Sequence, residues 1–285
     1  MTDLAHALGR IHAPDPLSAL NRLHWFDRED IYKFKVQDWE PKIGVLNQEN
    51  LLKQGIRCST FIAGAGDPDA LGSCTCNAMI AALSNILPVG NFTAFVIVWG
   101  RHSAVSKREV YQDVVGAERA AIGAYHAVTD QTADSASEWP PTDCGSSGPY
   151  LYKWLRSQGR IASEAIAQHT AESIISLMQR DGALLGTPWP SAWFTPDAAG
   201  FVDGNGTQAA VQQQINNGIA GGHEVFLSAI EKLAFLPTGI IDPAHTVLRF
   251  RNSWGPSWGD NGSAYLHLST LLMLSAHIDI RQFRA

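Results

Sequence analysis

The chain has 285 residues, of which 45% are hydrophobic and 17% charged, and its formal net charge at pH 7 is −6. This length is near the size at which one hydrophobic core stops growing, so we expect one large domain or two lobes that share an interface. No basic run could follow a phosphate backbone, which argues against a nucleic-acid partner. No stretch reaches the about 18 apolar residues of a membrane helix, and the N-terminus lacks a signal-peptide pattern. We therefore expect no membrane partner and a cytoplasmic location.

The chain contains four cysteines: Cys58, Cys74, Cys76 and Cys144. Four are too few for a disulfide scaffold, so reduced, buried thiols are expected. A zinc site is the least favoured alternative, because the CxC pair and two remote cysteines lack the spacing of structural zinc ligands. We expect no metal and no other cofactor.

The first part of the chain indicates helices. Residues 1–55 show no sustained periodicity, so this segment is an N-terminal extension or a packed arm of open role, inhibition included. Apolar residues then recur at helical spacing in CNAMIAALSNIL, and two further helices are predicted over 147–159 and 170–182. FTAFVIVWG, residues 92–100, is typical of a buried strand.

From residue 183 onward, short apolar runs alternate with turn residues. These runs are GALLG, EVFLSAI, TVLRFRN and GSAYLHL, and they predict an antiparallel sheet. A mainly helical part, about 56–182, is thus followed by a mainly β part, about 183–285. Helices first and strands second indicate an α+β fold with two unlike lobes and a cleft between them.

Two cysteines lie at the start of the first predicted helix, in LGSCTCNAMIAAL. The partial positive charge of a helix N-terminus lowers a thiol pKa, so this position suits a nucleophile. Cys74 and Cys76 point roughly 200° apart on a helix, and only one can face a cleft. Cys76 shares a stripe with the apolar residues Met79, Ile80 and Leu83. We therefore expect Cys76 to be buried and Cys74 to be the exposed thiol.

Four separated motifs resemble the papain-like cysteine peptidases and occur in the same order. They are GSCTCNA, GTPWPSAWFTPDAAG (186–200), GGHEV and NSWGPSWGDNG, of which the last is the most specific. The first three are similar to the bacterial branch of that family. The resemblance covers roughly residues 65–268, and it implies a papain-like two-lobe catalytic domain over 56–285.

The resemblance assigns roles to individual residues. Cys74 matches the nucleophile, His223 the general base and acid, and Asn252 the group that orients the imidazole. Trp254 matches the ring that shields the histidine–asparagine hydrogen bond. Gly145 and Ser146 match a glycine-bearing wall that holds the substrate backbone.

Two other candidates are weaker. Side chains alternate along a strand, so Glu224 points away from His223 and is interpreted as structural. Among the other histidines, only His245 is kept as a remote substitute for His223.

One family feature is not matched at its expected place. Six residues before the nucleophile, the family has a glutamine that donates to the oxyanion, but here Pro68 occupies that position. Proline offers neither a side-chain amide nor a backbone N–H. Gln54 is a speculative substitute donor.

The sequence therefore favours a thiol-dependent hydrolase that cleaves peptide bonds through a cysteine acyl-enzyme. An amide-forming acyltransferase that uses the same Cys–His–Asn site is an alternative, and so is an inactive binding protein on this fold. The expected partner is a peptide or acyl substrate, and the oligomeric state is left open.

Overall fold

The computed structural model describes residues 33–48, 71–86, 94–98, 103–107, 114–129 and 145–284. Cys58, Cys144, Gln54 and Pro68 lie outside the described residues, as does most of the predicted N-terminal extension. The described helices are α2 (Cys74–Ile86), α3 (Val114–Thr129), α4 (Gly148–Ser157), α5 (Ala171–Met178), α6 (Gln208–Asn216) and α7 (Leu268–Met273). The described strands are β1 (Gln37–Asp38), β2 (Ala94–Val98), β3 (Ser103–Lys107), β4 (Ser163–Ile166), β5 (Ala183–Pro190), β6 (Ile219–Lys232), β7 (Val247–Arg251), β8 (Ser263–His267) and β9 (Asp279–Arg284).

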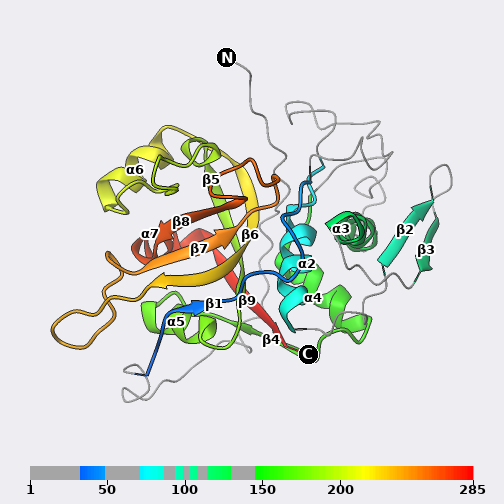
Figure 1. Cartoon of the computed structure of the whole chain (residues 1–285), viewed down its shortest axis with the longest axis horizontal. Coiled ribbons are helices and arrows are strands. Elements are labelled where there is room, and N and C mark those ends of the chain that lie inside the picture. The colour runs from blue at the N-terminus through cyan, green and yellow to red at the C-terminus, as the bar shows by residue number, and fades with distance from the viewer. Residues whose placement is uncertain are drawn as a thin grey trace.

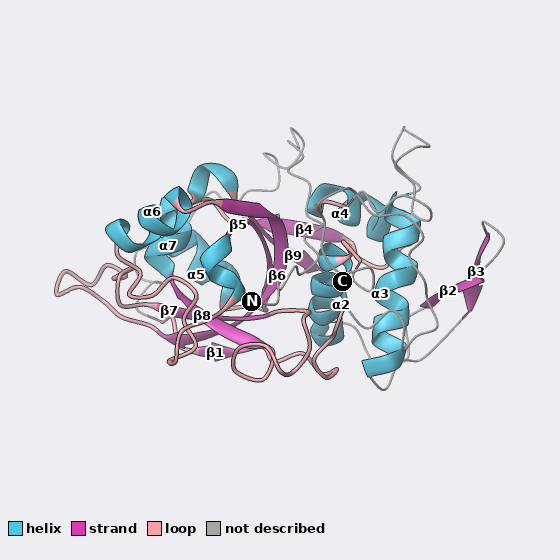
Figure 2. Ribbon diagram, turned by 90° about the horizontal axis from the view of Figure 1, so that it is seen from above, coloured by secondary structure: helices cyan, strands magenta, loops and turns pink. Residues whose placement is uncertain are grey.

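Three of the described helices lie on one side of the molecule, and the large sheet with the other three lies on the opposite side. Figure 1 shows α2, α3 and α4 on one side and the large sheet with α5, α6 and α7 on the other, and Figure 2 shows the same separation from above. Strands β2 and β3 form a separate two-stranded sheet that packs beside α3. The predicted α+β architecture is confirmed. Among the described helices, none is both long and apolar enough to cross a bilayer.

The large sheet is antiparallel, as the alternating runs after residue 183 predict. Its strand order is β4-β9-β5-β6-β7-β8, and β1 pairs with Ala229 and Ile230 of β6 on the edge opposite to β7. All four predicted runs form strands: β5, β6, β7 and β8. The 14-residue strand β6 is central, because it pairs with β5, β7 and β1 and also packs against α2.

Two hydrophobic clusters lie on the two faces of the sheet. Phe226 of β6 packs into the cluster around α2, α3 and α4, whereas its neighbours Val225 and Leu227 pack into the cluster around α5 and α7. This alternation follows from the pleat, which sends successive side chains to opposite faces. The sheet therefore contributes to both lobes.

Helix α2 is surrounded on all sides. Every residue from Cys74 to Ser84 is buried, and the helix contacts α3, α4, β5, β6 and β9. Its sequence contains no charged residue, which suits a helix that has no face toward water. The start of α2 is thereby fixed in the middle of the molecule.

The described part of the N-terminal segment, residues 33–48, contacts both lobes. Trp39 Nε1 donates a hydrogen bond to the Met178 carbonyl at the end of α5, and Asn85 at the end of α2 donates to the Trp39 carbonyl. Asp38 and Glu40 form ion pairs with Arg249 of β7. These contacts attach the segment to α2, α5 and β7 ahead of Asn47 and Gln48.

Candidate active site

His223 and Asn252 meet through the pairing of the sheet. His223 lies near the start of β6 and Asn252 directly follows the end of β7, so the antiparallel pair brings them together. His223 Nε2 lies 2.8 Å from Asn252 Oδ1, and both residues are buried. Asn252 Oδ1 also accepts the backbone N–H of Ser253 at 2.8 Å.

The second bond fixes the orientation of the amide. A backbone N–H can only donate, so the atom that it meets must be the amide oxygen and not its nitrogen. Nε2 of His223 must then donate to the same oxygen. In the neutral ring, the proton on Nε2 leaves Nδ1 as the basic nitrogen. The geometry thus selects which ring nitrogen of His223 can take up a proton.

Tryptophan rings enclose this hydrogen bond. Trp254 stacks on the His223 ring with centroids 4.7 Å apart, and Trp189 meets the same ring edge-on at 4.6 Å. Trp193 in turn packs edge-on against Trp189 at 5.3 Å. All three tryptophans are buried, so water is kept away from the His223–Asn252 pair. Exclusion of water strengthens such a hydrogen bond.

Cys74 is the first residue of α2, so its thiol lies on the first turn, where the helix dipole favours a thiolate. Cys76 belongs to the hydrophobic cluster around α2, whereas Cys74 belongs to neither cluster. Burial raises the pKa of the Cys76 thiol well above its ordinary value. The predicted burial of Cys76 is confirmed.

The expectation that Cys74 is exposed is wrong, because its exposed fraction is 0%. The reason is the central place of α2, which contacts other elements along its whole length. The helix packs against β6, the strand that carries His223. Cys74 and His223 thus come from two elements in contact, and both are buried.

Gln48 was not anticipated from the sequence. Its Nε2 donates to the Leu71 carbonyl at 3.0 Å, and its Oε1 accepts the Ser253 hydroxyl at 2.6 Å. Its backbone N–H donates to the Ser253 carbonyl at 2.8 Å. Gln48 is 3% exposed. A buried amide therefore lies between the segment that leads into Cys74 and the residue that follows Asn252.

Gln48 and Leu71 are in contact although they are far apart in sequence. The Leu71 backbone N–H bonds back to the Gln48 carbonyl at 3.4 Å, so the two residues are neighbours in space although residues 49–70 separate them in sequence. A rule that counts positions back from Cys74 therefore arrives at Pro68 and misses Gln48. The available signal was a glutamine in LNQEN, followed by a stretch without periodicity that ends at GSC.

The remaining candidates differ in their surroundings. Glu224 is buried and close enough to Cys76 to influence its thiol, which places it toward α2. His245 lies beyond the far end of β6, roughly 30 Å along the strand from His223. Its side chain is 69% exposed and pairs with Asp242, so it does not belong to this site.

Gly145 and Ser146 are buried just before α4, where Gly145 N–H donates to the Tyr125 hydroxyl. Their contact with substrate stays a prediction.

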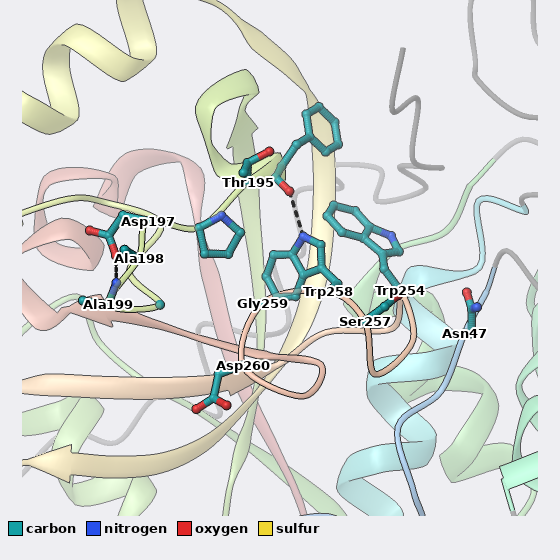
Figure 3. A pocket seen from close by; sticks show the side chains of 13 residues that line it. Asn47, Thr195, Asp197, Ala198, Ala199, Trp254, Ser257, Trp258, Gly259 and Asp260 are labelled. Atoms are coloured by element: carbon teal, nitrogen blue, oxygen red, sulfur yellow. Dashed lines mark hydrogen bonds between the residues drawn. The ribbon is translucent and has the colours of Figure 1, made fainter. Parts of the chain in front are cut away.

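Two cavities flank this region. One, of about 740 Å³, is lined by Trp254, Trp258, Asn47 and the loop 194–200 (Figure 3). The other, of about 600 Å³, is mainly apolar and includes Gly221 and Gly222, which directly precede His223. Within the described part of the chain, no group of three or more His, Cys, Asp or Glu side chains could hold a metal ion.

Comparison with solved structures identifies the fold. The amino-acid sequence matches no protein-family model, and no curated protein matches it in sequence. The chain is similar in structure to xylellain, a cysteine protease from Xylella fastidiosa, with a TM-score of 0.51 and 15% identity over 99% of this chain and 97% of that one. It is also similar to procathepsin B from Trypanosoma congolense, with a TM-score of 0.50 and 12% identity over 98% of this chain and 87% of that one. The chain therefore has the papain-like fold, as the order of its motifs predicts.

Proposed function

We propose that this protein is a thiol-dependent peptidase in which Cys74 is the nucleophile, His223 the general base and acid, and Asn252 the group that orients the imidazole. The observation that carries the proposal is the His223–Asn252 hydrogen bond beneath Trp254, which leaves Nδ1 as the basic nitrogen of the ring. The fold and the position of Cys74 at the start of α2 support it.

The first half of the reaction forms an acyl-enzyme. Nδ1 of His223 takes the proton of the Cys74 thiol, and the thiolate attacks the carbonyl carbon of the scissile amide. As the tetrahedral intermediate collapses, the carbon–nitrogen bond breaks and the imidazolium gives its proton to the leaving nitrogen. The amine departs and a thioester to Cys74 remains.

Water completes the cycle. His223 takes a proton from a water molecule, whose oxygen attacks the thioester carbonyl, and the thiolate leaves as the carboxylic acid is released. If an amine takes the place of water, the same steps give an amide. This makes the acyltransferase alternative a question of which nucleophile reaches the acyl-enzyme.

Gln48 is the proposed donor to the oxyanion, together with the backbone N–H of Cys74. Ser253 holds Gln48 Oε1, which turns the amide nitrogen toward Leu71 and the segment that leads into Cys74. An amide nitrogen has two N–H groups, and only one is needed for the Leu71 carbonyl. The second is the group that we assign to the developing negative charge. This proposal supplies the donor that Pro68 cannot provide.

A partition experiment tests the function. Purified protein is given an unactivated peptide in one reaction and an acyl thioester in another, each with and without a primary amine, and acid and amide products are quantified. A peptidase releases acid from both substrates, and Cys74→Ala releases none. The matched control is Cys76→Ala, which retains activity because that thiol lies in the hydrophobic cluster.

The three candidate functions give different products. Amide product with negligible peptide cleavage would replace the peptidase by the acyltransferase. Absence of any Cys74-dependent product, in a protein shown to be folded, would support the inactive binding protein.

A further inference from the structure

The 740 Å³ cavity begins beside the candidate catalytic residues. Trp254, which forms one part of its wall, stacks on His223, and Asn47, which forms another, directly precedes Gln48. In acylation the imidazolium protonates the leaving nitrogen, so the leaving half of the substrate must start next to His223. The cavity therefore lies where the leaving half, or an incoming amine, would extend.

The cavity has an ordered wall. Trp258 Nε1 donates to the Phe194 carbonyl and ties the loop 194–200 to the turn after Asn252 (Figure 3). Asp197 Oδ1 accepts the backbone N–H groups of Ala199 and Phe201, both at 2.9 Å. The loop is therefore held by its own hydrogen bonds before any ligand arrives, which lowers the cost of ordering it upon binding.

The charges that line the cavity have one sign. Among the described lining residues, Asp197 and Asp260 are the charged ones, and no lysine or arginine joins them. Asp260 accepts the Tyr265 hydroxyl at 2.7 Å and interacts electrostatically with Arg251, so its charge is partly offset. Asp197 forms no ion pair with any described residue and is exposed. Asp197 is therefore the main source of negative potential at this cavity.

We propose that this cavity selects a positively charged side chain, above all arginine, on the amine side of the scissile bond. This inference rests on the proposed function. The aliphatic stem of arginine packs along the tryptophan side of the cavity, and its guanidinium reaches the loop that carries Asp197. A long side chain of this kind keeps its charged end in water while its stem is covered.

Acyl transfer offers a direct test, because an incoming amine occupies the same place as the departing one. A generic ester acylates the protein in the presence of equal concentrations of argininamide and citrullinamide, and the two amide products are measured. Citrulline has nearly the shape of arginine without its charge. We expect the arginine product to exceed the citrulline product about two- to fivefold, the range of a partly exposed ion pair. High salt should reduce this preference.

Charge-removing variants identify the source of the preference. Asp197→Asn keeps Oδ1 as the acceptor for the loop and removes only the charge, so the product ratio should fall close to one. Asp260→Asn should change the ratio less, because Arg251 already offsets that charge. The matched control is Asp242→Asn on the distant β6–β7 hairpin, which should leave the ratio unchanged.

The outcomes separate this inference from the proposed function. Cys74-dependent release of acid together with an arginine-to-citrulline ratio of one would overturn the inference and leave the function intact. If the ester gives no amide product, with or without release of acid, binding of arginyl-alaninamide and citrullyl-alaninamide to the Cys74→Ala protein is measured instead. Equal affinity for the two would overturn the inference, and tighter binding of the arginyl compound that Asp197→Asn abolishes would support it.

Discussion

Gln48 and Ser253 hold each other by two hydrogen bonds, one from the Ser253 hydroxyl to Gln48 Oε1 at 2.6 Å and one from the Gln48 backbone N–H to the Ser253 carbonyl at 2.8 Å. Ser253 also directs its own N–H to Asn252 Oδ1, which faces His223. Gln48, the last described residue of the N-terminal segment, is thus bonded to Ser253, which adjoins the His223–Asn252 pair. Gln48, Ser253, Asn252 and His223 form one connected group.

Removal of the Gln48 side chain should slow acylation without unfolding the protein. We expect Gln48→Ala to lower kcat/KM for an amide substrate about a hundredfold to a thousandfold, the usual effect of losing one oxyanion donor. The matched control is Gln54→Ala, which should change kcat/KM little. A folded Gln48→Ala protein, checked by thermal unfolding, that keeps full activity would exclude Gln48 as the donor.

A donor introduced at the sequence position of the family glutamine should bring no gain. If Gln48 already donates an N–H to the oxyanion, the glutamine in Pro68→Gln adds no donor that the oxyanion needs. The acylation rate of this variant on a peptide ester should therefore equal that of the wild type. The rate is measured by the burst of released alcohol. A Pro68→Gln protein that acylates at least tenfold faster would show that the oxyanion lacks a donor in the wild type.

The two histidines on β6 and its hairpin should behave differently. His223→Ala should abolish amide hydrolysis, whereas His245→Ala should retain it, because His245 is exposed and pairs with Asp242 far from the site. In the wild type we expect a bell-shaped dependence of kcat/KM on pH, from the ion pair on the acid side and the imidazolium on the alkaline side. An unchanged profile in His223→Ala would exclude this histidine as the base.

Cys76 should make the fold less stable at alkaline pH. Burial raises the pKa of its thiol in the folded state, while the unfolded thiol ionises near an ordinary pKa of about 8.5. The folded state then binds more protons than the unfolded state above that pH, so the free energy of unfolding falls by up to about 1.4 kcal/mol per pH unit. Below about pH 8 this loss is absent.

Cys76→Ala isolates the contribution of this thiol. The variant loses about 1 kcal/mol of packing at pH 7 but has no thiol to ionise at this position. Urea unfolding should therefore show the variant less stable than the wild type at pH 7 but as stable or more stable at pH 10, where the wild type has lost about 2 kcal/mol through Cys76. An equal difference at both pH values would mean that burial of Cys76 does not oppose its ionisation.

Local patterns were sufficient for much of the fold. The helix after GSC, the helix before Gly159 and the runs that form β5 to β8 all bury one face or both, so their apolar spacing is visible in the sequence. Thr170 accepts the Ser173 backbone N–H and caps α5, although that helix ends at Met178, before the end of the predicted range 170–182. Asp181 binds the Gly182 N–H instead, and the chain then enters β5.

Features that depend on distant parts of the chain were missed. The stripe on α2 predicts an exposed Cys74, but the elements that surround the helix decide its burial. Gln48 and Leu71 are joined by a backbone hydrogen bond although 22 residues separate them in sequence. The strands β4 and β9 pair with each other although most of the sheet separates them along the chain. Spacing along the sequence carries no signal for such contacts.

Trapping the acyl-enzyme tests the central claim most directly. The protein is mixed with an activated peptide ester, quenched in acid within the first turnover, digested and mapped by mass spectrometry. We predict one acyl group on the peptide that contains Cys74, fragmentation that places it on Cys74 and not on Cys76, and no adduct in Cys74→Ala. An acyl group on any other cysteine, or ester hydrolysis that continues in Cys74→Ala, would contradict the account.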